Sequence, residues 1–167
     1  MAKPIRIYWD ACAWIAYIAQ EKRVLIQGDK FENRFAMCEN VLKSAREGKW
    51  EIVTSAFTLA EVCKPGSVKS SPASNLPSFF DRSYILTVPV DVSIGRRAQA
   101  LQMSGLSKLT PPDAIHLASA QRSESTELHT FDAGLLALDG LISLPSGGSI
   151  KICKPSENTP MGPLFGD

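Results

Sequence analysis

The sequence lacks the cysteine patterns that would identify a zinc knuckle or a redox motif. Its four cysteines, Cys12, Cys38, Cys63 and Cys153, form no C-x-x-C pair and have no histidine near them in the sequence. We therefore expect reduced thiols that pack as small hydrophobic side chains. Reduced thiols are typical of the cytoplasm, which is where we expect the protein to act.

Long apolar runs are also absent. The longest, residues 11–19, is less than half of the roughly 20 residues that span a bilayer. Residues 1–4 lead directly into the strand-like segment IRIYWD, so no signal peptide is expected. The sequence therefore predicts a protein that neither enters nor crosses a membrane.

Net charge is small, at +1, so a positive field over the whole molecule cannot be the main means of holding a nucleic acid. A polyanion would have to be bound locally, by metal ions and a few basic side chains. The candidates by position are Lys64, Lys69, Arg82, Arg96, Arg97 and Lys108.

The order of the predicted elements indicates an α/β fold. Strands are expected at residues 5–9, 51–54, 84–88, 127–131 and 149–153, and helices at residues 11–19, 35–46, 93–102 and directly after Ser55 and Thr110. Strands that alternate with helices predict a three-layer α/β/α domain around a mostly parallel sheet of four to five strands. We expect one domain over residues 1–153, followed by a flexible tail at 154–167.

The segment from 64 to 78 reads KPGSVKSSPASNLPS and holds three prolines and five serines. Its length and composition predict a mobile loop. The loop directly follows the helix predicted to carry Glu61, so Lys64 and Lys69 are weak candidates for contacts with a phosphate backbone.

Four acids are expected at one edge of the sheet. Asp10 and Asp132 follow strands directly, and Glu61 and Asp113 fall near the starts of helices that leave the same edge, where α/β sheets bind ligands. Two carboxylates about 4 Å apart repel by about 4 kcal/mol at an effective dielectric constant of about 20. The sequence thus favours a hard divalent cation between them, Mg²⁺ with Mn²⁺ as a substitute. The alternative is four unconnected caps and surface charges.

At this point the chain resembles the PIN domain family, and within it the toxin-type (VapC-like) ribonucleases of bacterial toxin–antitoxin pairs. The resemblance covers nearly the whole chain. It lies in IYWDACAWIAYI with Asp10, TSAFTLAEV with Glu61, TPPDAIHLASA with Asp113 and LHTFDAGLLAL with Asp132, in the order of the family. It implies Mg²⁺-dependent cleavage of single-stranded RNA and frequent homodimers, with the four acids as metal ligands or water-positioning groups.

Four positions bear on how closely the chain follows the family pattern. Ala11 and Cys12 stand where a hydroxyl residue is common after the first acid, and Gly134 stands where some members have a further acid. Thr130 matches the small hydroxyl residue before the last acid and is a weak candidate for substrate contact. The missing hydroxyl after Asp10 affects the support of that carboxylate more than metal binding itself.

Other residues suited to catalysis or stacking receive structural interpretations. His116, three residues after Asp113, and His129, within a strand, are assigned no catalytic role. The three tryptophans are expected in the core rather than as base-stacking platforms. Cys12 has no base within sequence reach and is not expected to act as a nucleophile.

The function expected from the sequence is a Mg²⁺-dependent endoribonuclease, controlled by a small antitoxin protein whose arginine or lysine enters the acidic pocket. One alternative is a catalytically silent PIN-like module that binds RNA or protein. Another is an aspartate-based phosphatase, although that chemistry usually requires a second acid two residues after the first, where this chain has Cys12.

Overall fold

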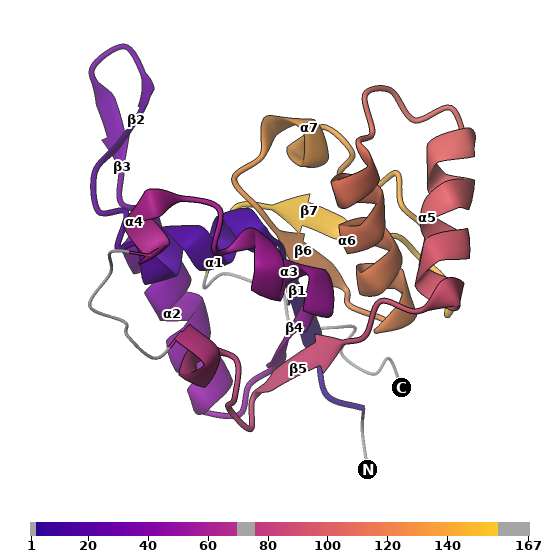
Figure 1. The fold of residues 1–167 in the computed structure, drawn as a ribbon, viewed down its shortest axis with the longest axis horizontal. Helices are drawn as coiled ribbons and strands as arrows, with labels where there is room; N and C mark the ends of the chain where they lie inside the picture. Colours follow the sequence, from indigo (N-terminus) through magenta and orange to yellow (C-terminus); the bar gives the residue numbers. More distant parts are fainter. Residues whose placement is uncertain (1–2, 70–75, 157–167) are drawn as a thin grey trace, which may run out of the picture.

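The structure is a computed structural model that describes residues 3–69 and 76–156. Within them, five parallel strands form one sheet in the order β5–β4–β1–β6–β7 (Figure 1). The strands are β1 (Arg6–Trp9), β4 (Glu51–Ser55), β5 (Ile85–Val88), β6 (Glu127–His129) and β7 (Lys151–Cys153). The predicted parallel sheet is confirmed. Because β1 lies at its centre, Asp10 leaves the sheet between the strands that lead to Glu61 and Asp132.

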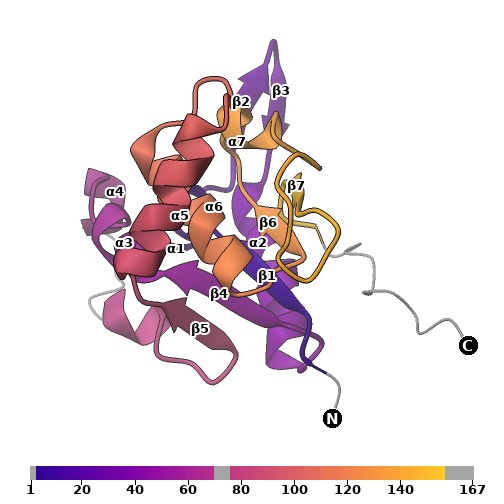
Figure 2. The same ribbon diagram turned by 90° about the vertical axis from the view of Figure 1, so that its right-hand side faces the viewer.

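Helices cover both faces of the sheet, which gives the three layers that the sequence predicted (Figure 2). On one face lie α1 (Ala11–Ile18) and α2 (Arg34–Arg46), and on the other α5 (Val92–Met103) and α6 (Pro111–Arg122). Alternate residues of β1 serve the two cores, since Trp9 packs with the α1–α2 side and Tyr8 with the α5–α6 side. All three tryptophans are buried, as expected.

Helix starts at the carboxyl edge use polar caps. Ser55 caps α3 (Ala56–Glu61), and Thr110 caps α6 with prolines at its first two positions, so both helices begin directly after the residues from which they were predicted. Asp10 and Asp132 are themselves the caps of α1 and of the short α7 (Ala133–Leu136). The capping pattern therefore places acids directly at the strand ends.

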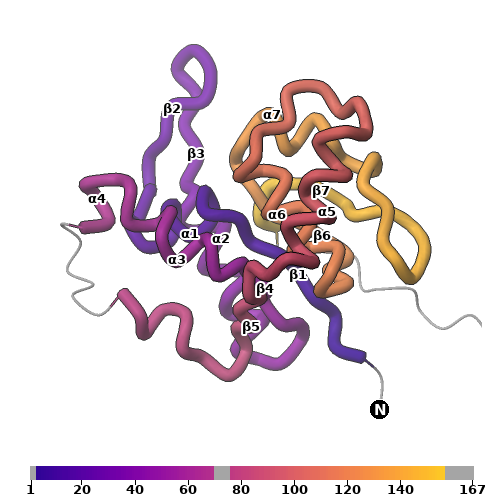
Figure 3. The backbone as a smooth tube through the Cα atoms, turned by 45° about the vertical axis from the view of Figure 1, so that its right-hand side comes forward, coloured from indigo at the N-terminus to yellow at the C-terminus, as the bar shows by residue number. Residues whose placement is uncertain are grey.

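Two segments differ from the sequence prediction. Residues 24–32 form an antiparallel hairpin, β2 (Val24–Gln27) and β3 (Lys30–Glu32), that projects from the body of the molecule (Figure 3), where no strand or helix was expected. The predicted 64–78 loop contains a short helix, α4 (Gly66–Lys69), and a 3₁₀ turn, η1 (Leu76–Phe79). Residues 70–75 of that loop and 157–167 of the predicted tail lie outside the described residues.

None of the helices in the described part of the chain is long and apolar enough to cross a membrane. The four thiols are free.

Candidate active site

Asp10 is the most enclosed of the four acids, with 2% of its surface exposed. Its Oδ1 accepts a hydrogen bond from the Ala13 amide at 3.1 Å, and its Oδ2 accepts one from the Thr130 hydroxyl at 2.5 Å. Burial raises the pKa of Asp10 to about 6, against the lowering effects of His116, Thr130 and Ala13, and the charge of Asp132 adds to the rise. The negative charge of Asp10 is thus costly in the fold.

Thr130 joins two of the acids. While its hydroxyl donates to Asp10, the same oxygen accepts a hydrogen bond from the backbone N–H of Asp132 at 2.9 Å. Thr130 has 0% exposure. The geometry therefore favours a positioning role for Thr130 over the substrate contact that we expected from the sequence.

Asp132 and Asp113 lie half-buried at helix starts. Asp132 Oδ1 accepts from the Leu135 amide at 2.9 Å, and Asp113 is the third residue of α6, after the Thr110 cap. Burial raises the pKa of Asp113, and the charge of Asp132 adds to the rise while the Thr110 hydroxyl and His116 oppose it. A Cβ at Gly134 would stand 3.0 Å from Asp132 Oδ1, so a side chain at that position would crowd this acid.

Glu61 is the last residue of α3, which corrects the prediction that it lies in an early turn of its helix. Pro65 prevents the helix from running on, because it has no N–H to donate to the Glu61 carbonyl and disfavours helical backbone at Lys64. Glu61 has 24% of its side chain exposed. Its position at the helix end, rather than the start, still directs it to the carboxyl edge, where it meets α6.

His116 is a site residue that sequence reasoning missed. It is 3% exposed, and its Nε2 lies 2.7 Å from Glu61 Oε2 while its Nδ1 lies 2.8 Å from the Tyr8 hydroxyl. Burial, with the charge of Asp10, raises the pKa of Tyr8. The phenol therefore stays protonated and can donate to Nδ1 while Nε2–H donates to Glu61. The available signal was the three-residue spacing from Asp113, which puts both side chains on neighbouring parts of the helix surface.

Cys12 lies within electrostatic reach of all four acids. Burial raises the pKa of the Cys12 thiol, and the next four contributions come from the charges of Asp10, Asp132, Glu61 and Asp113. Cys12 is exposed, so the region around it opens to solvent. A raised pKa keeps the thiol protonated, in agreement with the expectation that Cys12 is not a nucleophile.

The four acids are grouped loosely. Within residues 3–69 and 76–156, the one set of three His, Cys, Asp or Glu side chains whose ligand atoms all lie within 4.8 Å of one another is Glu127, His129 and Cys153. Mutual repulsion opposes a tighter approach of four carboxylates. Their donor atoms are oxygens that suit a hard divalent ion. Burial, with a further contribution from the charge of Asp132, raises the pKa values of Asp10 and Asp113, and a bound cation would offset the cost of ionising both.

Fold and site together define an α/β protein with an open acidic site at the carboxyl edge of its sheet. A family model of the PIN domain matches residues 7–141, and the chain belongs to the PIN domain family. No match was found among curated proteins.

Two solved structures are similar to this chain at low sequence identity. The VapC20 toxin of Mycobacterium tuberculosis, described as cleaving the sarcin–ricin loop, is 16% identical over 76% of this chain and 90% of that chain, with a TM-score of 0.53. A toxin–antitoxin complex from Klebsiella pneumoniae is 20% identical over 75% of this chain and 86% of that chain, with a TM-score of 0.47. The first likeness supports the fold, and the second is too weak to carry an argument.

Proposed function

We propose that this PIN-domain protein is a metal-dependent endoribonuclease that hydrolyses phosphodiester bonds in single-stranded RNA, with Mg²⁺ as its ion and Mn²⁺ as a substitute. One observation carries the proposal. At the carboxyl edge of the sheet, hydrogen bonds link Asp10 to Asp132 through Thr130 and join Glu61 to α6, the helix that has Asp113 in its first turn. Carboxylates so placed suit phosphoryl chemistry only with a cation among them.

The residues would divide the work as follows. Asp10, Asp113 and Asp132 would hold the ion, with Thr130 and the helix-start amides fixing the directions of Asp10 and Asp132. A bound Mg²⁺ would favour deprotonation of the attacking water and neutralise charge on the leaving oxygen.

Glu61 would position the water. His116 engages its Oε2, which leaves Oε1 to accept a hydrogen bond from the attacking water. Because Tyr8 holds the far side of the imidazole, the direction of the Glu61 carboxylate is fixed from within the core.

The assay compares cleavage of a mixed single-stranded RNA by the wild-type protein in Mg²⁺, in Mn²⁺ and with a chelator. Asp113→Asn should abolish cleavage while circular dichroism stays unchanged. The matched control is Asp29→Asn, the same change at an exposed position on the projecting hairpin, which should keep wild-type activity. Wild-type rates for Asp113→Asn would remove Asp113 from the site.

The two alternatives give other outcomes in the same assay. RNA binding without cleavage in either metal would favour a silent binding module. Hydrolysis of a phosphate monoester, with RNA left intact, would favour the aspartate-based phosphatase.

Regulation by an antitoxin is the second part of the proposal. It is supported by the resemblance to toxin-type PIN ribonucleases and by the toxin description of the similar Mycobacterium tuberculosis structure. An acidic pocket that attracts Mg²⁺ also suits a guanidinium, which pairs with carboxylates in a bidentate manner. We expect a small protein whose arginine or lysine enters the pocket.

Co-purification from the native operon tests this partner. The complex should be inactive, and RNase activity should appear when the small protein is removed. A chain that purifies alone and is harmless on overexpression would exclude the toxin role and leave an unregulated ribonuclease.

A further inference from the structure

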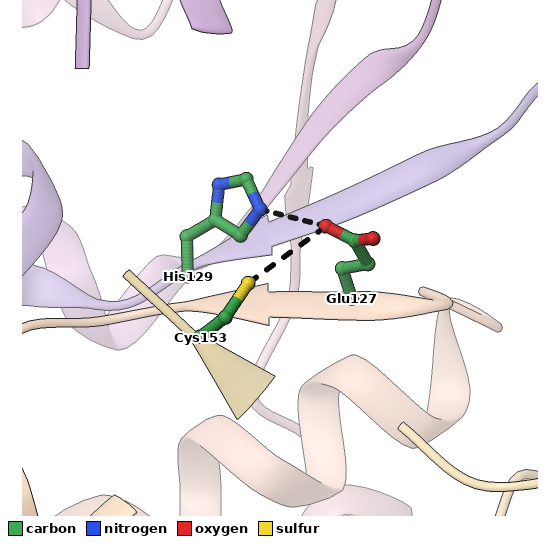
Figure 4. Close-up of side chains that lie close together, drawn as sticks. All are labelled: Glu127, His129 and Cys153. Atoms are coloured by element: carbon green, nitrogen blue, oxygen red, sulfur yellow. Dashed lines mark hydrogen bonds and ion pairs between the residues drawn. The ribbon is translucent and has the colours of Figure 1, made fainter. Parts of the chain in front are cut away.

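A second cluster of metal-binding side chains lies away from the four acids. Glu127 and His129 are two residues apart on β6, so their side chains lie on the same face of the strand. His129 pairs in register with Cys153 on the edge strand β7. Figure 4 shows the three side chains on the same side of these strands, directed toward one another. His129 Nε2 and Cys153 Sγ lie 2.9 Å and 4.0 Å from the same oxygen, Glu127 Oε2.

The cluster is set apart from the acidic site. Leu128, between its two β6 members, faces the α5–α6 core, so Glu127 and His129 point to the opposite face of the sheet. Burial, Glu127 and Lys151 affect the pKa of His129, and none of the four site acids contributes to it.

We propose that Cys153 Sγ, His129 Nε2 and Glu127 Oε2 bind a thiophilic divalent ion of the Zn²⁺ class, with water as the fourth ligand. Thiolate, imidazole and carboxylate are the ligand types that Zn²⁺ takes in tetrahedral sites, whereas Mg²⁺ selects oxygen alone. The three ligand atoms already lie within 4.8 Å of one another, as ligands of one ion must. The two proposed metal sites of the chain would thus select different ions.

The surroundings suit such a site. Glu127 and His129 are 3% and 0% exposed, whereas Cys153, on the edge strand β7, is only half-buried. Lys151 Nζ lies 3.6 Å from Glu127 Oε1, so it can hold that oxygen and leave Oε2 for the ion.

Protons balance on binding. Burial and the charge of Glu127 raise the pKa of Cys153 to about 11, so the metal-free cluster holds a thiol, and coordination releases one proton from sulfur. His129 keeps its proton, which moves from Nε2 to Nδ1. His129 Nδ1 has no hydrogen-bond partner in the described structure, so no protein group at that nitrogen holds the imidazole in its Nε2-protonated form.

The consequence is a cross-link between β6 and the three-residue edge strand β7. Since an ion that binds the folded state selectively stabilises it, Zn²⁺ should raise the melting temperature of the full chain. This stabilisation does not depend on the ribonuclease proposal.

The test uses Co²⁺ as a spectroscopic substitute for Zn²⁺, added to chelator-treated full-length protein in excess Mg²⁺. Thiolate coordination gives a near-ultraviolet charge-transfer band, and we expect one equivalent of Co²⁺ to produce it and one equivalent of Zn²⁺ to remove it. Cys153→Ser should lose the band, and Glu127→Gln should weaken Co²⁺ binding. Cys63→Ser, a matched change at another half-buried thiol, should keep the band.

The acidic site supplies the control that separates the two proposals. Asp113→Asn should keep the Co²⁺ band even though it loses ribonuclease activity. A wild-type protein without the band, or a band that survives in Cys153→Ser, would overturn the zinc-class site. Because the first of these outcomes needs no variant, a misfolded substitution cannot obscure the result.

Discussion

Asp10 and Glu32 are both largely removed from solvent, yet their surroundings shift their pKa values in opposite directions. At Asp10 burial and the charge of Asp132 raise the pKa to about 6. At Glu32 burial also acts to raise the pKa, but hydrogen bonds and charges from Lys154 and Arg34 outweigh it, so the net shift is downward. Lys154 Nζ lies 2.7 Å from Glu32 Oε2, and Arg34 Nε lies 2.8 Å from Glu32 Oε1.

The difference distinguishes Glu32, an acid that stabilises the fold, from Asp10, an acid suited to binding a cation. Glu32 joins the base of the hairpin to the segment after β7 through ion pairs that are complete within the chain. Asp10 has only neutral donors within hydrogen-bond distance and other acids nearby, so its charge is compensated best by something from outside. A pKa raised among clustered acids marks a functional candidate.

The largest effect should come from removing the negative charge of each of these two acids in turn. Asp10→Asn should lower RNase activity by about 100-fold or more, because ligands of one ion act as a unit. In the metal-free protein at neutral pH the same change should raise stability. The rise of the Asp10 pKa from 3.8 to about 6 corresponds to a free-energy cost of at most about 3 kcal/mol for keeping Asp10 ionised in the folded protein.

Glu32→Gln is the matched control with the opposite signs. It should keep activity and lower stability by about 1 to 2 kcal/mol, because Lys154 and Arg34 would lose a charged partner. Urea denaturation in a chelator measures both variants. A destabilised Asp10→Asn protein would show that Asp10 is structural after all, and the comparison would fail.

The next largest effect should follow from the group that directs Glu61. His116→Gln should reduce kcat by about 10- to 100-fold, the usual cost of removing a group that supports an active-site ligand. Since His116 touches Glu61 rather than the substrate, KM for RNA should change little. Equal losses in this variant and in a Glu61→Gln variant, with no further loss in the double variant, would confirm that the two act together. Additive losses would separate them.

The pH dependence of stability should differ between the two carboxylates. The folded-state pKa of Asp10 lies above its ordinary value of 3.8, so the folded protein binds more protons between about pH 4 and pH 6, and the contribution of Asp10 to stability falls as pH rises through this window. Lowering the pH from 7 to 5 should gain about 1 kcal/mol in the metal-free wild type relative to Asp10→Asn.

Glu32 has the opposite sign. Its lowered pKa gives a contribution that is present at neutral pH and is lost as the solution becomes acidic enough to protonate it. Parallel denaturation series at pH 5 and pH 7 separate the two acids, and an unchanged difference between wild type and Asp10→Asn would contradict the shift at Asp10.

The sheet, and the placement of the four acids near the ends of strands and helices, could be predicted from the sequence for local reasons. Strand periodicity, the Ser55 and Thr110 caps and the two prolines of α6 are all signals within a few residues. The hairpin at 24–32 was missed because its exposed Leu25, Ile26 and Phe31 give no alternation of buried and exposed positions.

The contacts that shape the site were not accessible in the same way. The Tyr8–His116–Glu61 chain joins three elements far apart in sequence, and the raised pKa of Asp10 depends on burial by the whole fold. The cysteine pattern argued against a zinc knuckle, and it gave no sign that strand register brings Cys153 beside His129. Each of these features depends on contacts between residues that lie far apart in the sequence.

The smallest effect concerns Lys64 and Lys69, both exposed near the end of the helix that carries Glu61. If each contacts an RNA phosphate, as the sequence predicted, Lys64→Ala with Lys69→Ala should weaken binding modestly. The slope of log affinity against log salt should become less steep by about 1.4, since each contact with a single strand contributes about 0.7. Lys43→Ala with Lys49→Ala, at the opposite end of the sheet beside the start of β4, is the matched control. Binding is measured in the inactive Asp113→Asn background, and equal slopes for the two double variants would show that RNA takes another path to the acids.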